Sequence, residues 1–200
     1  MANARWAKMI RIAELADLPS ITAIYNDAVM ARCSGDLAPV TVDSRKPWFL
    51  EHVPERYPIF IACDGGEILG WSSLSPYRKG RQALRYTAEI SYFVALSHRR
   101  KGVASSLINH CCVKGVALGL KTLFAIVLEH NTPSRRLLDR TGFTVWGFLP
   151  GVADFGDLEC GQYYYGLRIN PPNKAPEPTP ASVTPRADAR VAPDAGAAQL

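Results

Sequence analysis

The sequence lacks the patterns that mark a metal site, a disulfide scaffold or a membrane protein. Its five cysteines are an odd number without C-x-x-C spacing, and its four histidines show no metal-ligand spacing. We therefore expect free thiols, a reducing compartment and no metal ion. No apolar run approaches the roughly 18 residues of a membrane span, and no segment at the start resembles a signal peptide. These absences predict a soluble, cytoplasmic protein without a membrane partner.

Aromatic side chains are absent from residues 171–200, which are rich in proline and alanine. Such a segment cannot bury enough apolar surface to offset the entropy lost on ordering. At the other end, residues 1–8 precede the first strand-like run. The composition therefore predicts three parts, an N-terminal extension over 1–8, a folded domain over 9–169 and a disordered tail over 170–200.

Removal of the predicted tail should leave the domain unchanged. We expect a chain ending at Asn170 to keep both its melting temperature and its turnover, because a disordered segment contributes no packing. Thermal unfolding and steady-state kinetics check this. A fall of several degrees on truncation would show instead that the tail docks on the domain.

Apolar periodicity predicts both helices and strands in the folded domain. Expected helices cover residues 17–29, 43–53, 103–118 and 132–142. Expected strands cover residues 9–13, 59–63, 68–74, 86–95, 122–128, 143–148 and 161–169. The strand–helix–strand order between residues 86 and 128 implies a parallel pair with a right-handed crossover. The pattern predicts one α/β domain with a mixed sheet.

A basic turn containing glycine separates an expected strand from an expected helix. It reads Arg99-Arg100-Lys101-Gly102-Val103-Ala104-Ser105. A strand that enters a helix through such a turn leaves unpaired backbone N–H groups at the positive end of the helix dipole. Phosphate and pyrophosphate groups bind at such places, and Gly102 lets the backbone approach the anion closely. The turn therefore predicts that a phosphorylated cofactor binds here.

The spacing Arg99-x-x-Gly102-x-Ala104 resembles the pyrophosphate-binding signature of GNAT-type N-acetyltransferases. The later segment Asn131-Thr132-Pro133-Ser134, followed by Thr141-Gly142-Phe143, resembles the second cofactor-contacting segment of that family. One branch contains phosphinothricin N-acetyltransferase and relatives that act on methionine sulfone or sulfoximine. Further likeness to this branch lies at residues 24–29, 45–49 and 87–91. The resemblance extends from about Met9 to Ile169.

The resemblance implies a mixed, mostly antiparallel central sheet with one parallel strand pair and helices on both faces. It also implies acetyl-CoA as the acetyl donor and a small-molecule amine as the acceptor. Backbone groups of Tyr92, Phe93 and Val94 would contact the acyl end of acetyl-CoA, with an N–H near Val94 facing the acetyl oxygen. The family's members often dimerise, so a homodimer is expected.

The resemblance also implies that Asn131 and Ser134 contact the cofactor. Asn131 has a second interpretation as a turn residue, because asparagine favours such positions. Many family members carry a tyrosine or histidine seven residues after this asparagine, which protonates the departing thiolate. This chain has Leu138 there, which cannot donate a proton. The thiolate would then leave unaided or through water, as its low basicity permits.

Glu89 is the candidate general base. It is the only acid between Glu67 and Glu129, and it lies in an otherwise apolar strand. Its position before the turn resembles that of the catalytic glutamate in the phosphinothricin branch. A carboxylate partly removed from water beside a cofactor would have its pKa raised towards a useful value. The alternative is a solvated strand glutamate on the same face as Thr87 and Ser91.

The acceptor is less well defined by the sequence. A cationic cluster precedes the Glu89 strand, and we take Arg78, Arg81 and Tyr86 as candidate substrate-binding residues because arginine binds carboxylate or phosphinate in bidentate fashion. A solvated loop is the alternative. The segment 152–159 keeps the Phe155-Gly156 pair of the branch but adds three acids, which could favour a cationic amine.

The resemblance thus implies acetyl transfer to the primary amine of an amino acid or analogue such as methionine sulfone or phosphinothricin. Alternative acceptors are a polyamine, an aminoglycoside or a protein N-terminus. A catalytically silent acyl-CoA sensor is a different class, which the intact Glu89 disfavours. A nucleic-acid-binding module would use the net charge of +5, but its basic clusters lack interleaved aromatic residues. We therefore expect no nucleic-acid partner.

Overall fold

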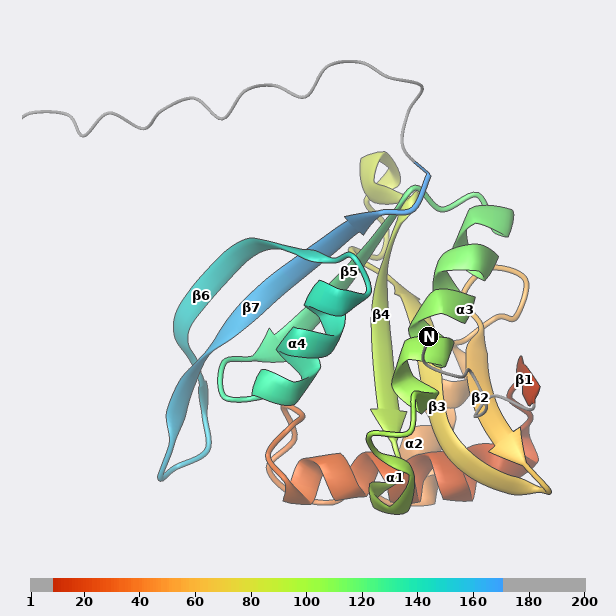
Figure 1. The fold of residues 1–200 in the computed structure, drawn as a ribbon, viewed down its shortest axis with the longest axis horizontal. Coiled ribbons are helices and arrows are strands. Elements are labelled where there is room, and N and C mark those ends of the chain that lie inside the picture. Colours follow the sequence, from red (N-terminus) through yellow and green to blue (C-terminus); the bar gives the residue numbers. More distant parts are fainter. Residues whose placement is uncertain (1–8, 171–200) are drawn as a thin grey trace, which may run out of the picture.

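The computed structural model describes residues 9–170, and Figure 1 shows how their elements are arranged. The predicted extension over residues 1–8 and the predicted tail beyond Asn170 lie outside the described residues. A sheet of seven strands runs through the middle of the described part, in the order β1-β2-β3-β4-β5-β7-β6. The strands are β1 (Met9–Ile12), β2 (Ile59–Asp64), β3 (Glu67–Pro76), β4 (Thr87–Val94), β5 (Thr122–Leu128), β6 (Thr144–Asp154) and β7 (Glu159–Arg168).

One pair of neighbouring strands, β4 and β5, is parallel, and the other described pairs are antiparallel. The helix that follows β4 supplies the crossover between the parallel strands, as the sequence predicts. The mixed, mostly antiparallel sheet confirms the predicted fold class.

Helices cover both faces of the sheet, also as predicted (Figure 1). The α-helices are α1 (Leu18–Met30), α2 (Val42–Leu50), α3 (Val103–Ala117) and α4 (Thr132–Arg140), and short 3-10 segments lie at Leu15–Asp17, Gln82–Leu84 and Leu96–His98. Leu107 and Ile108 of α3 and Leu138 of α4 are buried in one apolar cluster against the sheet. A second cluster, on the other face, contains Ile21 of α1 and Trp71 of β3.

The clusters follow from the alternation of side chains along the strands. In β4, Ala88 and Ile90 point to the cluster beneath α3 and α4, whereas Glu89 points to the opposite face. In β5, six of the seven residues are buried, as predicted for a strand covered on both faces. The first apolar cluster therefore packs the strands against α3 and α4. The opposite face of the sheet carries polar side chains such as Glu89.

Most elements lie within two residues of their predicted bounds, and two differ by three residues or more at one end. The helix predicted over residues 43–53 is α2, which begins one residue earlier, behind a capping box between Thr41 and Ser44, and ends at Leu50. The strand predicted over 143–148 continues to Asp154. Register shifts against β7 after Val145 and after Leu149 interrupt the alternation of β6, and most of its side chains are exposed, so apolar periodicity could not show its length.

All five cysteines are free thiols, as predicted. Cys63, Cys111 and Cys160 are buried, whereas Cys33 and Cys112 are half-buried. The adjacent Cys111 and Cys112 differ in burial because consecutive side chains on a helix point about 100° apart. Within residues 9–170, no helix combines the length and the apolar character needed to cross a bilayer.

Candidate active site

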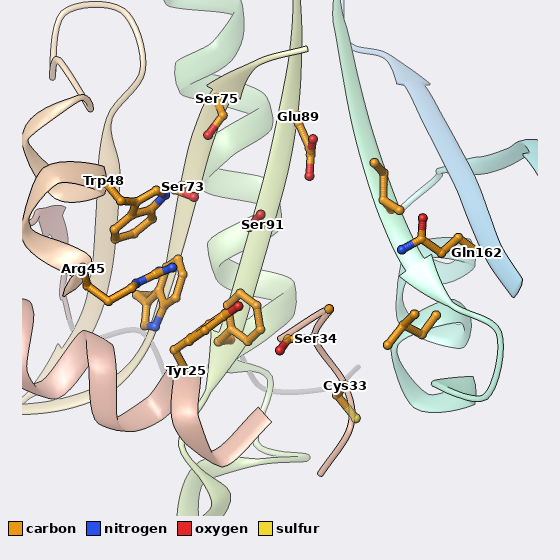
Figure 2. A pocket seen from close by; sticks show the side chains of 15 residues that line it. Tyr25, Cys33, Ser34, Arg45, Trp48, Ser73, Ser75, Glu89, Ser91 and Gln162 are labelled. Atoms are coloured by element: carbon orange, nitrogen blue, oxygen red, sulfur yellow. The ribbon is translucent and has the colours of Figure 1, made fainter. Parts of the chain in front are cut away.

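A cavity of about 320 Å³ opens on the sheet face that carries α1 and α2, and Figure 2 shows its lining. Strands β3 and β4 form its floor, and α1, α2, the loop after α1, β5 and β7 contribute the walls. Its polar and aromatic lining residues include Tyr25, Ser34, Arg45, Trp48, Trp71, Ser73, Ser75, Glu89, Ser91, Phe93 and Gln162.

Glu89 points into this cavity from the middle of β4 (Figure 2). Ser91 and Phe93 line the same cavity, because alternate residues of a strand share one face. Burial raises the pKa of the Glu89 carboxyl group above its ordinary value. Among the described residues, none donates a hydrogen bond to this carboxylate or pairs with it. It is therefore a half-buried, unpartnered base, unlike a solvated strand glutamate.

The strands β4 and β5 separate just beyond Glu89. Their pairing covers Thr87, Ala88 and Glu89 against 122–124, and β4 then continues to Val94 without a described partner on that side. Figure 1 shows the two strands diverging towards their carboxyl ends. Backbone N–H and C=O groups on this edge of β4 are therefore left to bind another extended group. The split leads from Glu89 towards the turn that begins α3.

The turn before α3 has the geometry of an anion site. Gly102 is the N-cap of α3, with φ of 84° in the left-handed region, and no side chain caps the helix. Arg100 also adopts a positive φ, of 61°. The first N–H groups of α3, at Val103, Ala104 and Ser105, have no acceptor within the helix. With Arg99 and Arg100 exposed beside them, these donors suit a phosphate group.

The start of α4 follows β5, so it lies on the β5 side of the split, opposite the turn before α3. Asn131 is the N-cap of α4, and its Oδ1 accepts a hydrogen bond from the Ser134 N–H at 3.2 Å. The Ser134 hydroxyl forms a 2.5 Å hydrogen bond with the Tyr92 hydroxyl, which joins α4 to β4. Burial raises the pKa of Tyr92 to about 12, so this phenol stays protonated. Asn131 is thus a capping residue whose Nδ2 can still donate to a ligand.

Other candidate residues lie elsewhere. Arg78, Arg81 and Tyr86 are exposed and do not line the cavity. Val103 is buried in the apolar core, so only its backbone is available to a cofactor. Leu138 is fully buried in the same core, and its side chain does not reach the cavity.

The acids of residues 152–159 also lie outside the cavity lining. The Asp157 carboxylate pairs with Arg32 at 2.9 Å, and this hydrogen-bonded partner lowers the pKa of Asp157. The Asp154 carboxylate accepts a hydrogen bond from the Gly156 N–H at 2.7 Å, within the turn between β6 and β7. These contacts account for two of the three acids as structural groups. Glu89 is the acid in the described cavity lining, so the lining carries one carboxylate and not the several that a polycation would need.

Several cavity residues escaped the sequence analysis. The Arg45 guanidinium of α2 lies over the rings of Trp48 and of Tyr25 in α1. His52, outside the lining, forms a 3.1 Å hydrogen bond with the lining residue Ser75. Burial lowers the pKa of His52, which favours its neutral form. The resemblance of residues 45–49 to the phosphinothricin branch pointed to this helix, but it assigned no function to any single side chain in it. Among residues 9–170, no cluster of histidine, cysteine and acidic side chains could hold a metal ion.

Comparison with known proteins identifies the family. A model described as the Acetyltransferase (GNAT) family matches residues 21–143. The chain belongs to the GNAT acetyltransferase family. It is therefore an acyltransferase, and the resemblance stated from its motifs is confirmed.

Relatives of this GNAT enzyme match most of its length. YwnH of Bacillus subtilis is 37% identical over 147 residues, which are 72% of this chain and 89% of YwnH. The L-methionine sulfoximine/L-methionine sulfone acetyltransferase of Pseudomonas paraeruginosa is 34% identical over 169 residues, 84% of this chain and 98% of the relative. The structure of yncA from Salmonella typhimurium with its cofactor acetyl-CoA matches with a TM-score of 0.77 and 28% identity, covering 84% of this chain and 97% of yncA.

Proposed function

We propose that this GNAT enzyme transfers an acetyl group from acetyl-CoA to the primary amine of a small amino acid or amino-acid analogue, such as methionine sulfone or phosphinothricin. The observation that carries the proposal is the unpartnered Glu89 carboxylate in a cavity beside the split between β4 and β5. The name of the Pseudomonas relative, an L-methionine sulfoximine/L-methionine sulfone acetyltransferase, supports the acceptor class.

The residues of the split suit acetyl-CoA. The N–H groups at the start of α3, with Arg99, Arg100 and Gly102, would hold its phosphates. The free edge of β4 from Tyr92 to Val94 would bind the amide-bearing arm, and Asn131 and Ser134 would bound the arm on the α4 side. When bound, acetyl-CoA supplies the acetyl group as an activated thioester. The lysine at position 101 belongs to the same turn.

Glu89 would prepare the acceptor. An amine attacks only after it loses the proton of its ammonium form, and a carboxylate within the same cavity can take that proton. The raised pKa of Glu89 makes it a stronger base than an exposed glutamate. The Val94 N–H would stabilise negative charge on the acetyl oxygen. Because the Leu138 side chain has no proton to donate, the thiolate would leave unaided or with a proton from water.

A thiol-release assay tests the proposed function. Acetyl-CoA is mixed with the full chain and one acceptor at a time, drawn from amino acids, methionine sulfone, phosphinothricin, polyamines and aminoglycosides. We expect CoA release with an amino acid or analogue and identification of an N-acetyl product by mass spectrometry. Release only with polyamines or aminoglycosides would contradict the acceptor class, and no release with any amine would contradict the activity.

The proposal includes a homodimer that acts in the reducing cytoplasm. Support for the dimer comes from β6, the edge strand of the sheet. Its apolar side chains Val145, Trp146, Phe148, Leu149 and Val152 are between 40% and 52% exposed. An exposed apolar edge strand favours association with another chain. The five free thiols support the compartment.

Light scattering should therefore give twice the mass of one chain in solution. The change Trp146→Glu should reduce that mass to one chain, because a charge would be buried without a partner. Val113→Glu, which adds the same charge at an exposed apolar position of α3, should leave the dimer intact. A wild-type mass of one chain, or dissociation by both variants, would contradict a dimer through β6.

A further inference from the structure

Arg45 is held on the wall of the cavity by aromatic rings. Its guanidinium carbon lies 3.8 Å from the ring centroid of Trp48 and 4.3 Å from that of Tyr25. Trp71, on the floor, lies further away at 5.9 Å. Planar guanidinium groups stack on aromatic faces, and two rings at these distances fix the orientation of the group. The side chain is therefore positioned before any ligand binds.

No hydrogen-bond acceptor satisfies this guanidinium among the described residues. Its Nε is buried without a partner, and no ion pair to Arg45 occurs in the described part of the chain. A half-buried cation whose N–H groups lack an acceptor is unfavourable, so such groups are usually paired or bind a ligand. Arg45 thus has oriented N–H donors and a positive charge, and no described residue accepts a hydrogen bond from it or forms an ion pair with it.

The charged and titratable groups around Arg45 do not neutralise it directly. The acid whose charge acts on Arg45 is Asp36, and its Oδ2 accepts a hydrogen bond from the Tyr25 hydroxyl at 2.6 Å. His52 lies behind Trp48, and its Nδ1 is 2.7 Å from the Trp48 carbonyl oxygen. Burial lowers the pKa of His52, so it adds little positive charge at neutral pH. Glu89 is the acid that lines the cavity itself.

Arg45 and Glu89 enter the cavity from different sides. Figure 2 shows Arg45 projecting from α2, Glu89 projecting from β4, and the hydroxyl groups of Ser73 and Ser91 on the floor between them. The α2 wall therefore carries a fixed cation, and the floor carries an unpartnered carboxylate. A molecule with an anionic group at one end and an amine at the other complements both groups.

We propose that Arg45 binds the carboxylate of the acceptor, so that the cavity selects zwitterionic α-amino acids and holds their amine towards Glu89. This inference rests on the proposed acetyl transfer, and it assigns the anion to Arg45 rather than to the exposed Arg78 and Arg81. The fork of guanidinium N–H groups matches the two oxygens of a carboxylate, which a lysine ammonium does not. Arg45 is a specificity-determining residue in this role.

Two acceptors that differ only in the carboxylate test the role of Arg45. Methionine sulfone is compared with the corresponding primary amine without its carboxylate. Arg45→Gln should lower kcat/KM for methionine sulfone by roughly 10- to 100-fold, the range for a lost charge-assisted hydrogen bond, mainly through KM. The same change should leave kcat/KM for the decarboxylated amine within about twofold. Lys46→Gln, which removes an exposed charge from the same helix, should change neither value.

Direct binding provides a readout that does not depend on turnover. By calorimetry, the carboxylic acid that lacks the amine should bind the wild-type chain, and Arg45→Gln should abolish that binding while acetyl-CoA affinity is kept. Arg45→Lys keeps the charge but loses the fork, so it should fall between the wild type and Arg45→Gln. If Arg45→Gln does not fold, Arg45→Lys alone tests the assignment, because it should bind the carboxylic acid more weakly than the wild type.

Three results would overturn the assignment. Equal losses for the two acceptors would make Arg45 a packing residue of the aromatic cluster. Undiminished binding of the carboxylic acid in Arg45→Gln would place the anion elsewhere. A wild-type enzyme that does not distinguish the two acceptors would show that the cavity does not select a carboxylate. If instead no amine releases CoA, the proposed function fails, and the calorimetric binding still decides the role of Arg45.

Discussion

Glu89→Gln should lower turnover at neutral pH by roughly 10²–10⁴-fold, the usual contribution of general acid–base catalysis. The amide has nearly the shape of the carboxylate but cannot accept the ammonium proton. Acetyl-CoA affinity should be unchanged, because Glu89 lines the cavity and not the turn before α3. Steady-state kinetics with the best acceptor and calorimetry with acetyl-CoA measure the two quantities separately.

The pH dependence makes this prediction specific. Burial raises the pKa of Glu89, so wild-type activity should rise with pH as the carboxylate forms, at a higher pH than for an exposed glutamate. Glu89→Gln should lack this step. Its deficit should shrink as the pH approaches the pKa of the amine, because the acceptor then arrives already deprotonated. A deficit that stays constant with pH would indicate lost orientation instead.

Stability provides the control for a structural role. A carboxyl group whose pKa is raised on folding stabilises the fold below its unfolded pKa, and this contribution is lost as the pH rises through the folded pKa. At neutral pH the ionised, half-buried Glu89 therefore destabilises the folded chain, and Glu89→Gln should melt at the same or a higher temperature. Glu55→Gln, at an exposed position outside the cavity, should be fully active. Full activity of Glu89→Gln would leave Glu89 a structural residue.

Local sequence patterns predicted the elements that surround the cofactor region. The bounds of β5 follow from seven consecutive residues that suit a buried strand, and a strand buried on both faces needs no information from elsewhere. The turn before α3 was readable because Gly102, its neighbours and the start of α3 are contiguous in the chain. Glu89 stood out for the same reason, as one acid in an apolar strand.

The residues on the acceptor side of the cavity could not be predicted from local sequence patterns. Arg45 reaches the cavity only because α2 packs beside α1, and α2 itself has no buried residue and so no apolar periodicity. The basic residues from Arg78 to Arg85 looked like a substrate site because they are close to Glu89 in sequence. In the structure Arg78 and Arg81 are exposed, and the cation of the cavity comes from a helix some forty residues earlier.

Gly102→Asp should weaken acetyl-CoA binding by on the order of 10²-fold or more, because it places a negative charge where phosphate is expected to bind. The site has room for the side chain, since a Cβ at Gly102 would meet nothing within 4 Å. The φ of 84° strains any side chain there, but asparagine and aspartate tolerate this region best. An aspartate at the N-cap also stabilises a helix. The variant should therefore fold, which circular dichroism checks.

Gly102→Asn separates charge from strain and capping. Asparagine has the size of aspartate, tolerates the same φ, and can cap the first N–H groups of α3 as aspartate does. Both variants should lose the affinity that depends on free N–H donors, but the repulsion between charges should appear in Gly102→Asp alone. The difference between the two dissociation constants should also shrink as salt is added, because ions screen that repulsion. Equal affinities at low salt would mean that no phosphate approaches Gly102, and the start of α3 would then have to be removed from the acetyl-CoA site.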